Sequence, residues 1–344
     1  MSAQRHSILV TGGAGYIGAH TCKALAGAGY LPIAFDNLSV GHRNFVRWGP
    51  LIEADIGETA AVIEACRTHH VSAAIHFAAS ALVGESVKDP GKYYRNNVAG
   101  TLSLAEGLRA ASVNTIVMSS SCAVYGVPEK QPIDEQTIPN PINPYGASKL
   151  MAEQILSDYE KAHGWRWSAL RYFNACGADA DADIGEARAE ETHLIPRALM
   201  WIQGYIDSFS VFGTDYPTAD GTAIRDYIHV SDLADAHVAA LRRLQANERV
   251  GVLNLGTGRG YSVLQVLKEI ERVTGVALRV NFEDRRAGDP PILIADPRQA
   301  QARLQFAPSR SDLETIIRSA WFWHQKAHPR HQSRALSAVA NSNS

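Results

Sequence analysis

The chain has 344 residues, of which 46% are hydrophobic and 20% charged, as in a water-soluble protein with a substantial core. The formal net charge is −2 with both signs scattered, so nucleic acid is not expected as a partner. No apolar run approaches the ~18 residues of a membrane span, and the N-terminus does not resemble a signal peptide. Four widely spaced cysteines indicate reduced thiols, so we expect a cytoplasmic protein without a disulfide framework or zinc site.

Strand-like and helical segments alternate through the first half of the chain. Short apolar runs predict strands at 7–11, 31–35, 51–54, 73–78 and 115–121. Helical spacing predicts helices at 15–28, 58–69 and 90–111 between them. Buried strands that alternate with helices indicate a parallel sheet covered on both faces.

The second half is less regular. It predicts a helix from residue 144 and a strand at 167–173, then an acidic loop at 178–189 and a helix at 192–202. Further strands are predicted at 209–212 and 252–255, turns at 216–221 and 256–260, and a helix at 263–274.

The expected fold class is α/β, a Rossmann-type doubly wound parallel sheet with a smaller α/β substrate-binding domain interleaved at its C-terminal side. The nucleotide-binding domain is expected at 1–175, with a returning segment at about 222–245. The smaller domain would comprise 176–221 and 246–330, and 331–344 would be a disordered tail.

A glycine-rich turn, TGGAGYIG at 11–18, follows the first predicted strand and opens the first helix. Gly12 permits a tight turn, Gly15 lets the backbone approach a pyrophosphate, and Gly18 lets the helix pack closely on the sheet. The helix N-terminus offers free N–H groups to the phosphates. Asp36 ends the second strand, where a carboxylate can bind ribose hydroxyls and repel a 2′-phosphate. NAD is therefore favoured over NADP.

Asp55 is predicted to end the third strand. Its carboxylate can reach the adenine amino group of a dinucleotide at the same sheet edge. A helix N-cap is the alternative interpretation, and one side chain can serve both purposes.

A candidate proton-transfer site combines Ser121, at the end of the fifth strand, with Tyr145 and Lys149 in the motif YGASK. Asn143 and Pro144 are typical of a helix start, so the Tyr and Lys lie on one face of the first two turns. A free tyrosine with a pKa near ~10 is a poor base at pH 7. Lys149 and a nicotinamide ring would stabilise the phenolate, and Ser121 could bind the same substrate hydroxyl.

The glycine turn, the strand-end serine and YxxxK together resemble the extended short-chain dehydrogenase/reductases. Within them, the sequence is most similar to the UDP-glucose 4-epimerases. The resemblance covers about 7–325 and includes HFAASALVGESVKDP (76–90), YYRNNVAGTL (93–102), SSSCAVYG (119–126), PINPYGASKLMAE (141–153), LRYFNACGA (170–178), VFGTDYPTADGTAIRDYIHVSDLADAH (211–237), NLGTG (254–258) and RRAGDPP (285–291).

This resemblance implies reversible inversion at C4 of UDP-galactose and UDP-glucose through a 4-keto sugar, with NAD retained through the cycle. Tyr145 would take the 4-hydroxyl proton. The protein would act in galactose metabolism and form a homodimer through helices at 90–111 and 144–163. Beyond the three glycines, the implied cofactor-binding residues are Tyr16, Ile17, Asp36, Asn37, Asp55, Ile56, Phe77, Ala78, Asn96, Ser121, Tyr145, Lys149 and Phe173.

On the substrate side, the resemblance implies that Arg225 and Arg286 clamp the diphosphate, because guanidinium groups suit phosphate oxygens. The remaining implied contacts, besides Ser121 and Tyr145, are Asn174, Leu194, Phe212 for the uracil, Asp289 for the uridine ribose, and Leu293 beside the sugar's 2-substituent. His193 and His229 are interpreted as structural, and no metal-ligand spacing is present.

Three positions bear on how far the resemblance extends. Ala81 stands where many relatives have a lysine, and the absence of that lysine would weaken retention of the cofactor. Ala123 stands where relatives often have a threonine near the substrate hydroxyls, so one possible hydrogen bond to the substrate is lost. Leu293 is bulky and should disfavour an N-acetyl group. The sequence therefore predicts a preference for UDP-glucose and UDP-galactose over the N-acetylated pair.

Several other activities remain open at this stage. A UDP-xylose/UDP-arabinose epimerase or a UDP-N-acetylglucosamine epimerase would use the same catalytic residues. A 4,6-dehydratase needs an acid and a base beside Ser121, where Cys122 and Ala123 stand instead. A one-way oxidoreductase would release NADH. A non-catalytic NAD-binding regulator would not need Ser121, Tyr145 and Lys149 together.

Overall fold

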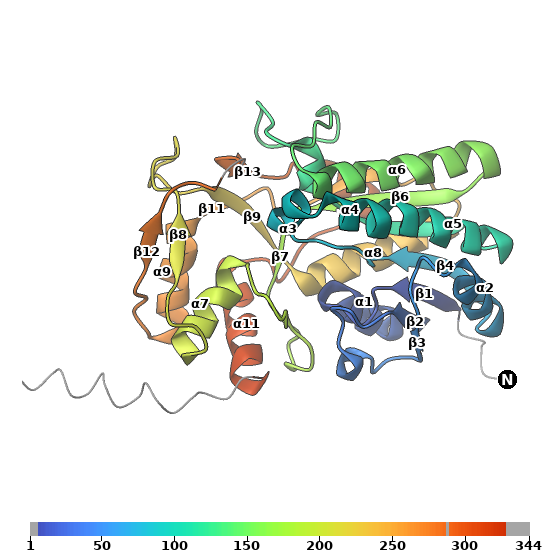
Figure 1. The fold of residues 1–344 in the computed structure, drawn as a ribbon, viewed down its shortest axis with the longest axis horizontal. Coiled ribbons are helices and arrows are strands. Elements are labelled where there is room, and N and C mark those ends of the chain that lie inside the picture. Colours follow the sequence, from blue (N-terminus) through green and yellow to red (C-terminus); the bar gives the residue numbers. More distant parts are fainter. Residues whose placement is uncertain (1–5, 287–288, 328–344) are drawn as a thin grey trace, which may run out of the picture.

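The structure, a computed structural model, describes residues 6–286 and 289–327 (Figure 1). The tail predicted at 331–344 lies outside these ranges. Within them, no helix combines the length and apolar character needed to cross a membrane.

A seven-stranded sheet forms the larger part of the molecule, and all of its neighbouring strands pair in parallel. Its strand order is β10-β6-β5-β4-β1-β2-β3. This doubly wound arrangement confirms the predicted fold class. The strands are β1 (Ser7–Thr11), β2 (Leu31–Asp36), β3 (Leu51–Glu53), β4 (Val71–His76), β5 (Thr115–Ser121), β6 (Arg166–Tyr172) and β10 (Gly251–Leu255).

Helices cover both faces of this sheet because successive strand residues point to opposite sides. Ile8 and Val10 of β1 pack in one core with Leu241, whereas Leu9 packs in the other with Leu104. The first face carries α1 (Tyr16–Gly27), α8 (Val230–Gln245) and α10 (Arg298–Leu304), and the second carries α2 (Thr59–Thr68), α5 (Gly100–Ala110) and α6 (Pro144–His163).

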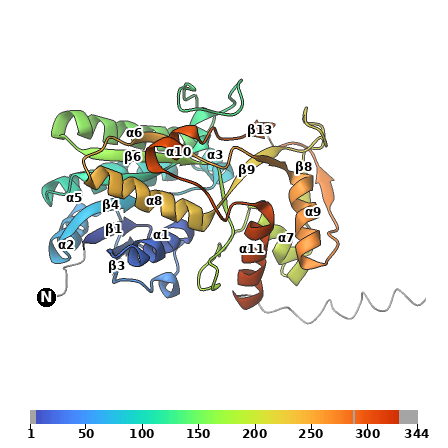
Figure 2. The same ribbon diagram turned by 180° about the vertical axis from the view of Figure 1, so that it is seen from behind.

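A second, smaller group of elements lies at one end of the molecule, where Figures 1 and 2 show α7, α9 and α11 beside β8 and β12. Strand β9 pairs with β7, β11 and β13, and β12 pairs with β8. These elements are β7 (Asn174–Cys176), α7 (Leu194–Gln203), β8 (Ser210–Phe212), β9 (Ile224–His229), β11 (Gly260–Ser262), α9 (Val263–Thr274), β12 (Asn281–Glu283), β13 (Ile292–Leu293) and α11 (Leu313–Ala327).

The predicted helix at 90–111 is interrupted in the structure. It consists of α4 (Pro90–Tyr93), a π-helical segment η2 (Tyr94–Ala99) and α5, and a short α3 (Val83–Lys88) precedes it. π-Helical turns are rare and are frequently found at functional sites. Here the turn carries Asn96 and the buried Asn97.

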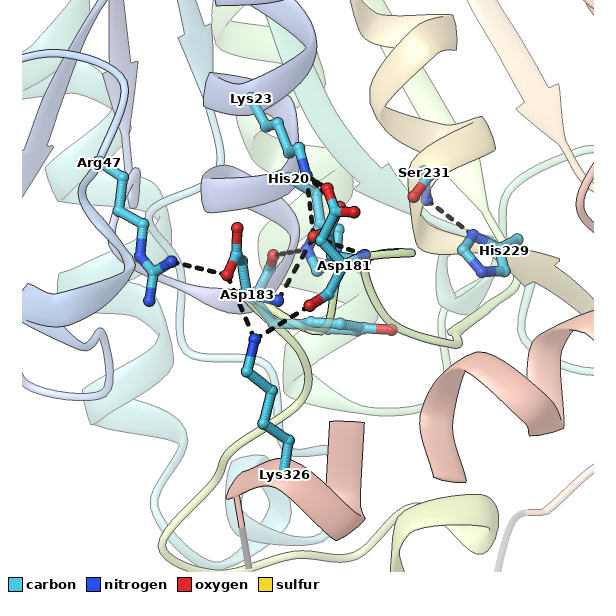
Figure 3. A network of polar contacts seen from close by, with 10 residues as sticks. His20, Lys23, Arg47, Asp181, Asp183, His229, Ser231 and Lys326 are labelled. Carbon is cyan, nitrogen blue, oxygen red and sulfur yellow. Dashed lines mark hydrogen bonds and ion pairs between the residues drawn. The ribbon is translucent and has the colours of Figure 1, made fainter. Parts of the chain in front are cut away.

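The acidic segment after β7 joins the two parts of the molecule through ion pairs (Figure 3). Its three carboxylates are bound by cations from elsewhere in the chain: Lys23 of α1 pairs with Asp179 and Asp181, Arg47 pairs with Asp183, and Lys326 of α11 binds Asp183 and the Asp181 carbonyl. The segment predicted as a loop therefore contacts α1 on one side and α11 on the other.

The glycine turn between β1 and α1 depends on very close backbone packing. A Cβ atom at Gly12 would lie 2.7 Å from the Ala78 backbone nitrogen, and Gly12 has a φ of +70° that favours glycine. A Cβ atom at Gly18 would lie 2.1 Å from the Gly12 carbonyl oxygen. Gly15 is less crowded, since its Cβ would meet only that carbonyl oxygen, at 3.2 Å.

This packing predicts opposite effects for two alanine substitutions in the same helix. Gly18→Ala should destabilise the protein by about 2 kcal/mol or more, because the methyl group overlaps the Gly12 carbonyl. Gly27→Ala is the matched control, since its Cβ would have no neighbour within 4 Å, and alanine should stabilise by about 0.5–1 kcal/mol. Thermal denaturation measures both, and an unchanged Tm for Gly18→Ala would contradict the analysis.

Candidate active site

The carboxyl ends of β1, β2 and β3 bring three predicted cofactor residues together. Asp36 is 7% exposed and accepts hydrogen bonds from the backbone N–H groups of Ala14 (3.0 Å) and Leu38 (2.9 Å). Burial raises its pKa, and these two hydrogen bonds oppose the shift. Asn37 donates to the Asp55 carboxylate at 2.7 Å. Asp55 was predicted to end the third strand, but β3 ends at Glu53, two residues earlier.

The end of β4 closes the other side of the glycine turn. The backbone N–H groups of Phe77 and Ala78 both donate to the Thr11 carbonyl, at 2.9 and 3.1 Å. Tyr16, at the start of α1, donates its hydroxyl to the Gly177 carbonyl at 2.5 Å. Asn96 lies nearby on η2 and donates to Ser80 and Asn97. Ile17 and Ile56 contribute to the two cores that flank the sheet.

Ser121 and Tyr145 are brought together where β5 ends and α6 begins. The Asn143 side chain accepts from the Gly146 N–H at 2.9 Å, which fixes the first turn of α6. Ser121 is 8% exposed, and its hydroxyl accepts from the Ala123 N–H at 3.1 Å. Burial raises the pKa of Tyr145, and a hydrogen bond with Ser121 opposes that shift.

Lys149 lies one turn further along α6 and is 4% exposed. Its ammonium group donates to the Ser119 carbonyl at 3.0 Å. Burial lowers the pKa of Lys149 to about 8, while the Glu153 carboxylate opposes the shift. The lowered pKa predicted for Tyr145 is not found in this arrangement, because burial dominates and the Lys149 ammonium is directed to the Ser119 carbonyl.

Asn97 was not singled out from the sequence, although its neighbour Asn96 was. Its side-chain amide donates to the Ser148 hydroxyl (2.9 Å) and to the Ser80 carbonyl (3.0 Å). Ser148 in turn donates to the Tyr145 carbonyl at 2.8 Å. Asn97 therefore links the loop after β4 to the first turn of α6. In the sequence, its position beside Asn96 is the one feature that could have indicated this role.

The predicted diphosphate and uridine residues lie on β9, β13 and β8. Arg225 of β9 pairs with Asp289 and donates to the Ile224 carbonyl at 2.8 Å. Leu293 of β13 is the register partner of Arg225. The guanidinium carbon of Arg286 lies 4.2 Å from the centre of the Phe212 ring, a cation–π contact.

Leu293 also connects this region to the strand-end serine. It packs in the same apolar cluster as Cys122, the residue after Ser121, and Phe173.

The remaining predicted positions lie in three other places. Asn174 donates to the Asp226 carbonyl at 3.0 Å. Leu194 is the first residue of α7 and packs against the core of the smaller group of elements. Ala81 is exposed in the loop after β4, and Ala123 is half-buried in the turn after β5.

His193 forms ion pairs with two carboxylates of the segment that precedes it. Its Nδ1 lies 2.8 Å from a Glu191 oxygen and 3.1 Å from a Glu186 oxygen, and its side chain is 44% exposed. Partial burial of the ring opposes a positive charge, but Glu186 and Glu191 raise the pKa of His193 to about 10. His229 is buried and caps α8 by accepting from the Ser231 N–H at 3.1 Å (Figure 3).

The described residues contain two groups whose donor atoms lie close enough for a metal ion, Glu186–Glu191–His193 and Asp179–Asp181–Asp183. In the first, the His193 ring lies between the carboxylates and Arg188 pairs with Glu186. In the second, lysine and arginine side chains already bind the carboxylates. Protein cations therefore neutralise both groups.

Comparison with known proteins agrees with this arrangement. Residues 8–256 match the NAD dependent epimerase/dehydratase family. The UDP-glucose 4-epimerase of Rhizobium leguminosarum bv. trifolii is 50% identical over 322 residues, 94% of this chain and 98% of that protein.

Two solved structures have the same fold over nearly their whole length. The Brucella ovis UDP-glucose 4-epimerase in complex with NAD has a TM-score of 0.90 and 54% identity, covering 92% of this chain and 97% of that one. The Bifidobacterium longum enzyme in complex with NAD+ and UDP has a TM-score of 0.88 and 36% identity, covering 93% and 98%. With its glycine turn, strand-end serine and Tyr–Lys pair in place, this chain belongs to the NAD dependent epimerase/dehydratase family.

Proposed function

We propose that this protein is an NAD-dependent UDP-glucose 4-epimerase that interconverts UDP-galactose and UDP-glucose. The observation that carries the proposal is the meeting of Ser121, Tyr145 and Lys149 at the sheet edge that also holds the glycine turn and Asp36. The similarity to UDP-glucose 4-epimerases over 94% of the chain supports the same assignment.

The residues at the sheet edge fit a dinucleotide. A Cβ atom would clash at Gly12 and Gly18, while Gly15 leaves the outer side of the turn open to a phosphate. Asp36, already held by two backbone N–H groups, presents a carboxylate for ribose hydroxyls. The proposed NAD-binding set also includes Tyr16, Ile17, Asn37, Asp55, Ile56, Phe77, Ala78, Asn96, Ser121, Tyr145, Lys149 and Phe173. Bound NAD would supply the hydride acceptor for C4 of the sugar.

The side chains of the chain itself perform the proton transfer and hold the sugar. In its phenolate form, Tyr145 would take the proton from the 4-hydroxyl and return it when the sugar is reduced again. Ser121 binds the same hydroxyl. The Lys149 ammonium group, which donates to the Ser119 carbonyl in this structure, would together with a bound nicotinamide ring supply the positive charge that favours the phenolate form of Tyr145.

On the substrate side, Arg225 and Arg286 would bind the diphosphate through their guanidinium groups. Asp289 already accepts from Arg225 and would share its carboxylate with the uridine ribose. The Phe212 ring offers a face to the uracil, in the place where Arg286 now stacks. Asn174 and Leu194 complete the proposed contacts.

The decisive experiment follows conversion of UDP-galactose to UDP-glucose by the purified protein without added NAD. The wild type should form a mixture of both sugars. Tyr145→Phe should lower the rate by about 10²–10⁴-fold, because the phenol is the proton acceptor. Tyr30→Phe is the matched control, since its hydroxyl binds Gln245 at 2.9 Å, away from Ser121 and Lys149.

Each other result has a distinct meaning. Conversion that requires added NAD would indicate weak retention of the cofactor, with Ala81 as the first position to examine. Full activity in Tyr145→Phe would refute the phenol as the base. Conversion of UDP-xylose alone, or of no UDP-sugar with NAD present, would point to a pentose epimerase or to a binding protein.

Leu293 is proposed to restrict the sugar's 2-substituent. UDP-N-acetylglucosamine should therefore be a much poorer substrate than UDP-glucose. Leu293→Ala should raise kcat/KM for the N-acetylated sugar by about tenfold or more, because removing the side chain makes room for the acetyl group. Ile292→Ala is the control, since neighbouring strand residues point to opposite faces. Comparable wild-type turnover of both sugars would refute this role.

We further propose that the protein is a cytoplasmic homodimer built on the predicted helices at 90–111 and 144–163. Leu102 of α5 and Met151 of α6 are each 46% exposed and provide apolar surface on these helices. The free thiols of all four cysteines support the cytoplasmic location.

Light scattering tests the homodimer directly. The expected mass at micromolar concentration is twice 37.3 kDa, and Met151→Glu should shift the protein toward monomer by placing a charge in the apolar contact. Val127→Glu is a control, since Val127 is exposed outside both helices. A wild-type mass of a single chain would refute the dimer.

A further inference from the structure

A third residue continues the spacing of the Tyr–Lys pair on α6. Tyr145, Lys149 and Glu153 follow one another at intervals of four residues, so they lie along one face of the helix. Glu153 is a carboxylate only 4% exposed. The function described above does not use it, and a buried carboxylate needs partners that satisfy its charge.

Three hydrogen bonds satisfy the Glu153 carboxylate. The Ser120 hydroxyl donates to one oxygen at 2.5 Å, and the Arg171 guanidinium donates to both oxygens, at 2.9 and 2.5 Å. Arg171 is 5% exposed and also donates to the Tyr125 hydroxyl at 2.9 Å. Tyr125 donates to Asn254 at 2.8 Å. The network thus crosses from α6 to β5, β6, η3 (Cys122–Tyr125) and β10.

These contacts join the two elements that carry the proposed catalytic residues. Ser120 immediately precedes Ser121 on β5, whereas Glu153 lies on the helix that carries Tyr145 and Lys149. Charge-assisted hydrogen bonds of this kind are directional and about twice as strong as neutral ones. The carboxylate therefore fixes the end of β5 against α6.

Glu153 also acts on the charge of Lys149. Burial lowers the pKa of Lys149 to about 8, and Glu153 is the charged group that opposes this shift. Among the other titratable groups, His76 on β4 is close enough for Lys149 to lower its pKa, Tyr145 lies one turn back on the same helix, and Tyr172 on β6 shares Ser119 with Lys149, whereas Arg171 is bound to Glu153. Burial holds His76 neutral by lowering its pKa to about 3.

We propose that Glu153 is a positioning residue for the epimerase reaction, holding β5 against α6 and favouring the ammonium form of Lys149 beside Tyr145. This inference rests on the proposed function. It differs from a purely structural role, in which a buried ion pair contributes only to folding, because it predicts a change in the pH dependence of catalysis.

The direction of that change follows from the sign of the charge. Without the Glu153 carboxylate, Lys149 loses its proton at lower pH. The rate should therefore begin to fall at lower pH as the solution becomes more alkaline. Glu153→Gln should move the alkaline limb of kcat down by about one pH unit.

Asp232→Asn provides a closely matched control. Asp232 is a 2% exposed carboxylate that also accepts from a serine, Ser311 at 2.6 Å, and from an arginine, Arg310 at 2.9 Å. It lies on α8, which packs on the opposite face of the sheet from α6. This variant should lose stability without moving the pH profile.

The experiment measures kcat for UDP-galactose from pH 6 to pH 10 in the wild type and both variants, together with their Tm values. A lower alkaline limb in Glu153→Gln alone supports the proposal. An equal loss of kcat at every pH in Glu153→Gln, with the alkaline limb left where it is in the wild type and in Asp232→Asn, would overturn it.

Two further results keep the test decisive. If Glu153→Gln does not fold, the double variant Glu153→Met with Arg171→Met removes both buried charges and should move the alkaline limb in the same direction by a smaller amount, because Glu153 is the charged group that acts on Lys149. If that variant folds and its profile matches the wild type, the proposal fails. A wild type inactive on UDP-galactose would instead refute the proposed function, before any variant is compared.

Discussion

The close contact between Gly18 and the Gly12 carbonyl is the constraint on which the site depends. It places the first turn of α1 directly under the end of β1, so that free helix N–H groups face the edge where β2 and β4 also end. Parallel pairing then brings the ends of β3 and β5 to the same edge. Asp36 and Ser121 therefore lie at the same edge of the sheet although they are far apart in sequence.

Elements with strong local signals could be predicted from the sequence. Helix α6 begins after Asn143 and ends before Gly164, and α9 lies between a Ser262 capping box and Gly275, so both boundaries depend on adjacent residues. Strand β9 was missed because Ile224–His229 is a mixed polar segment whose partners come from β7, β11 and β13. No local pattern records such distant pairing.

In the candidate site, too, features set by neighbouring residues could be predicted from the sequence, whereas features set by residues distant in sequence could not. The glycine turn and the Tyr–Lys spacing are local motifs, and both were visible in the sequence. The charge of His193 depends on Glu186 and Glu191, which fold back onto its ring, so its interpretation as a structural residue missed that charge. Likewise, the partners of Glu153 lie on β5 and β6, and only the fold brings Ser120 and Arg171 to it.

The π-helical turn η2 has a consequence for the rotational phase of the helices on either side of it. Each residue of an α-helix advances the rotation by about 100°, whereas the wider π-helical turn Tyr94–Ala99 accommodates an extra residue in nearly the same rotation. Leu104 and Leu108 are fully buried on α5, and Tyr93 on α4 is buried with its hydroxyl bound to the Leu82 backbone. Regular α-helical winding of the same residues would rotate α4 relative to α5 and bring one of these sets out of its buried position. The π-helical winding therefore keeps the two buried surfaces in phase, and regular winding would require a segment one residue shorter.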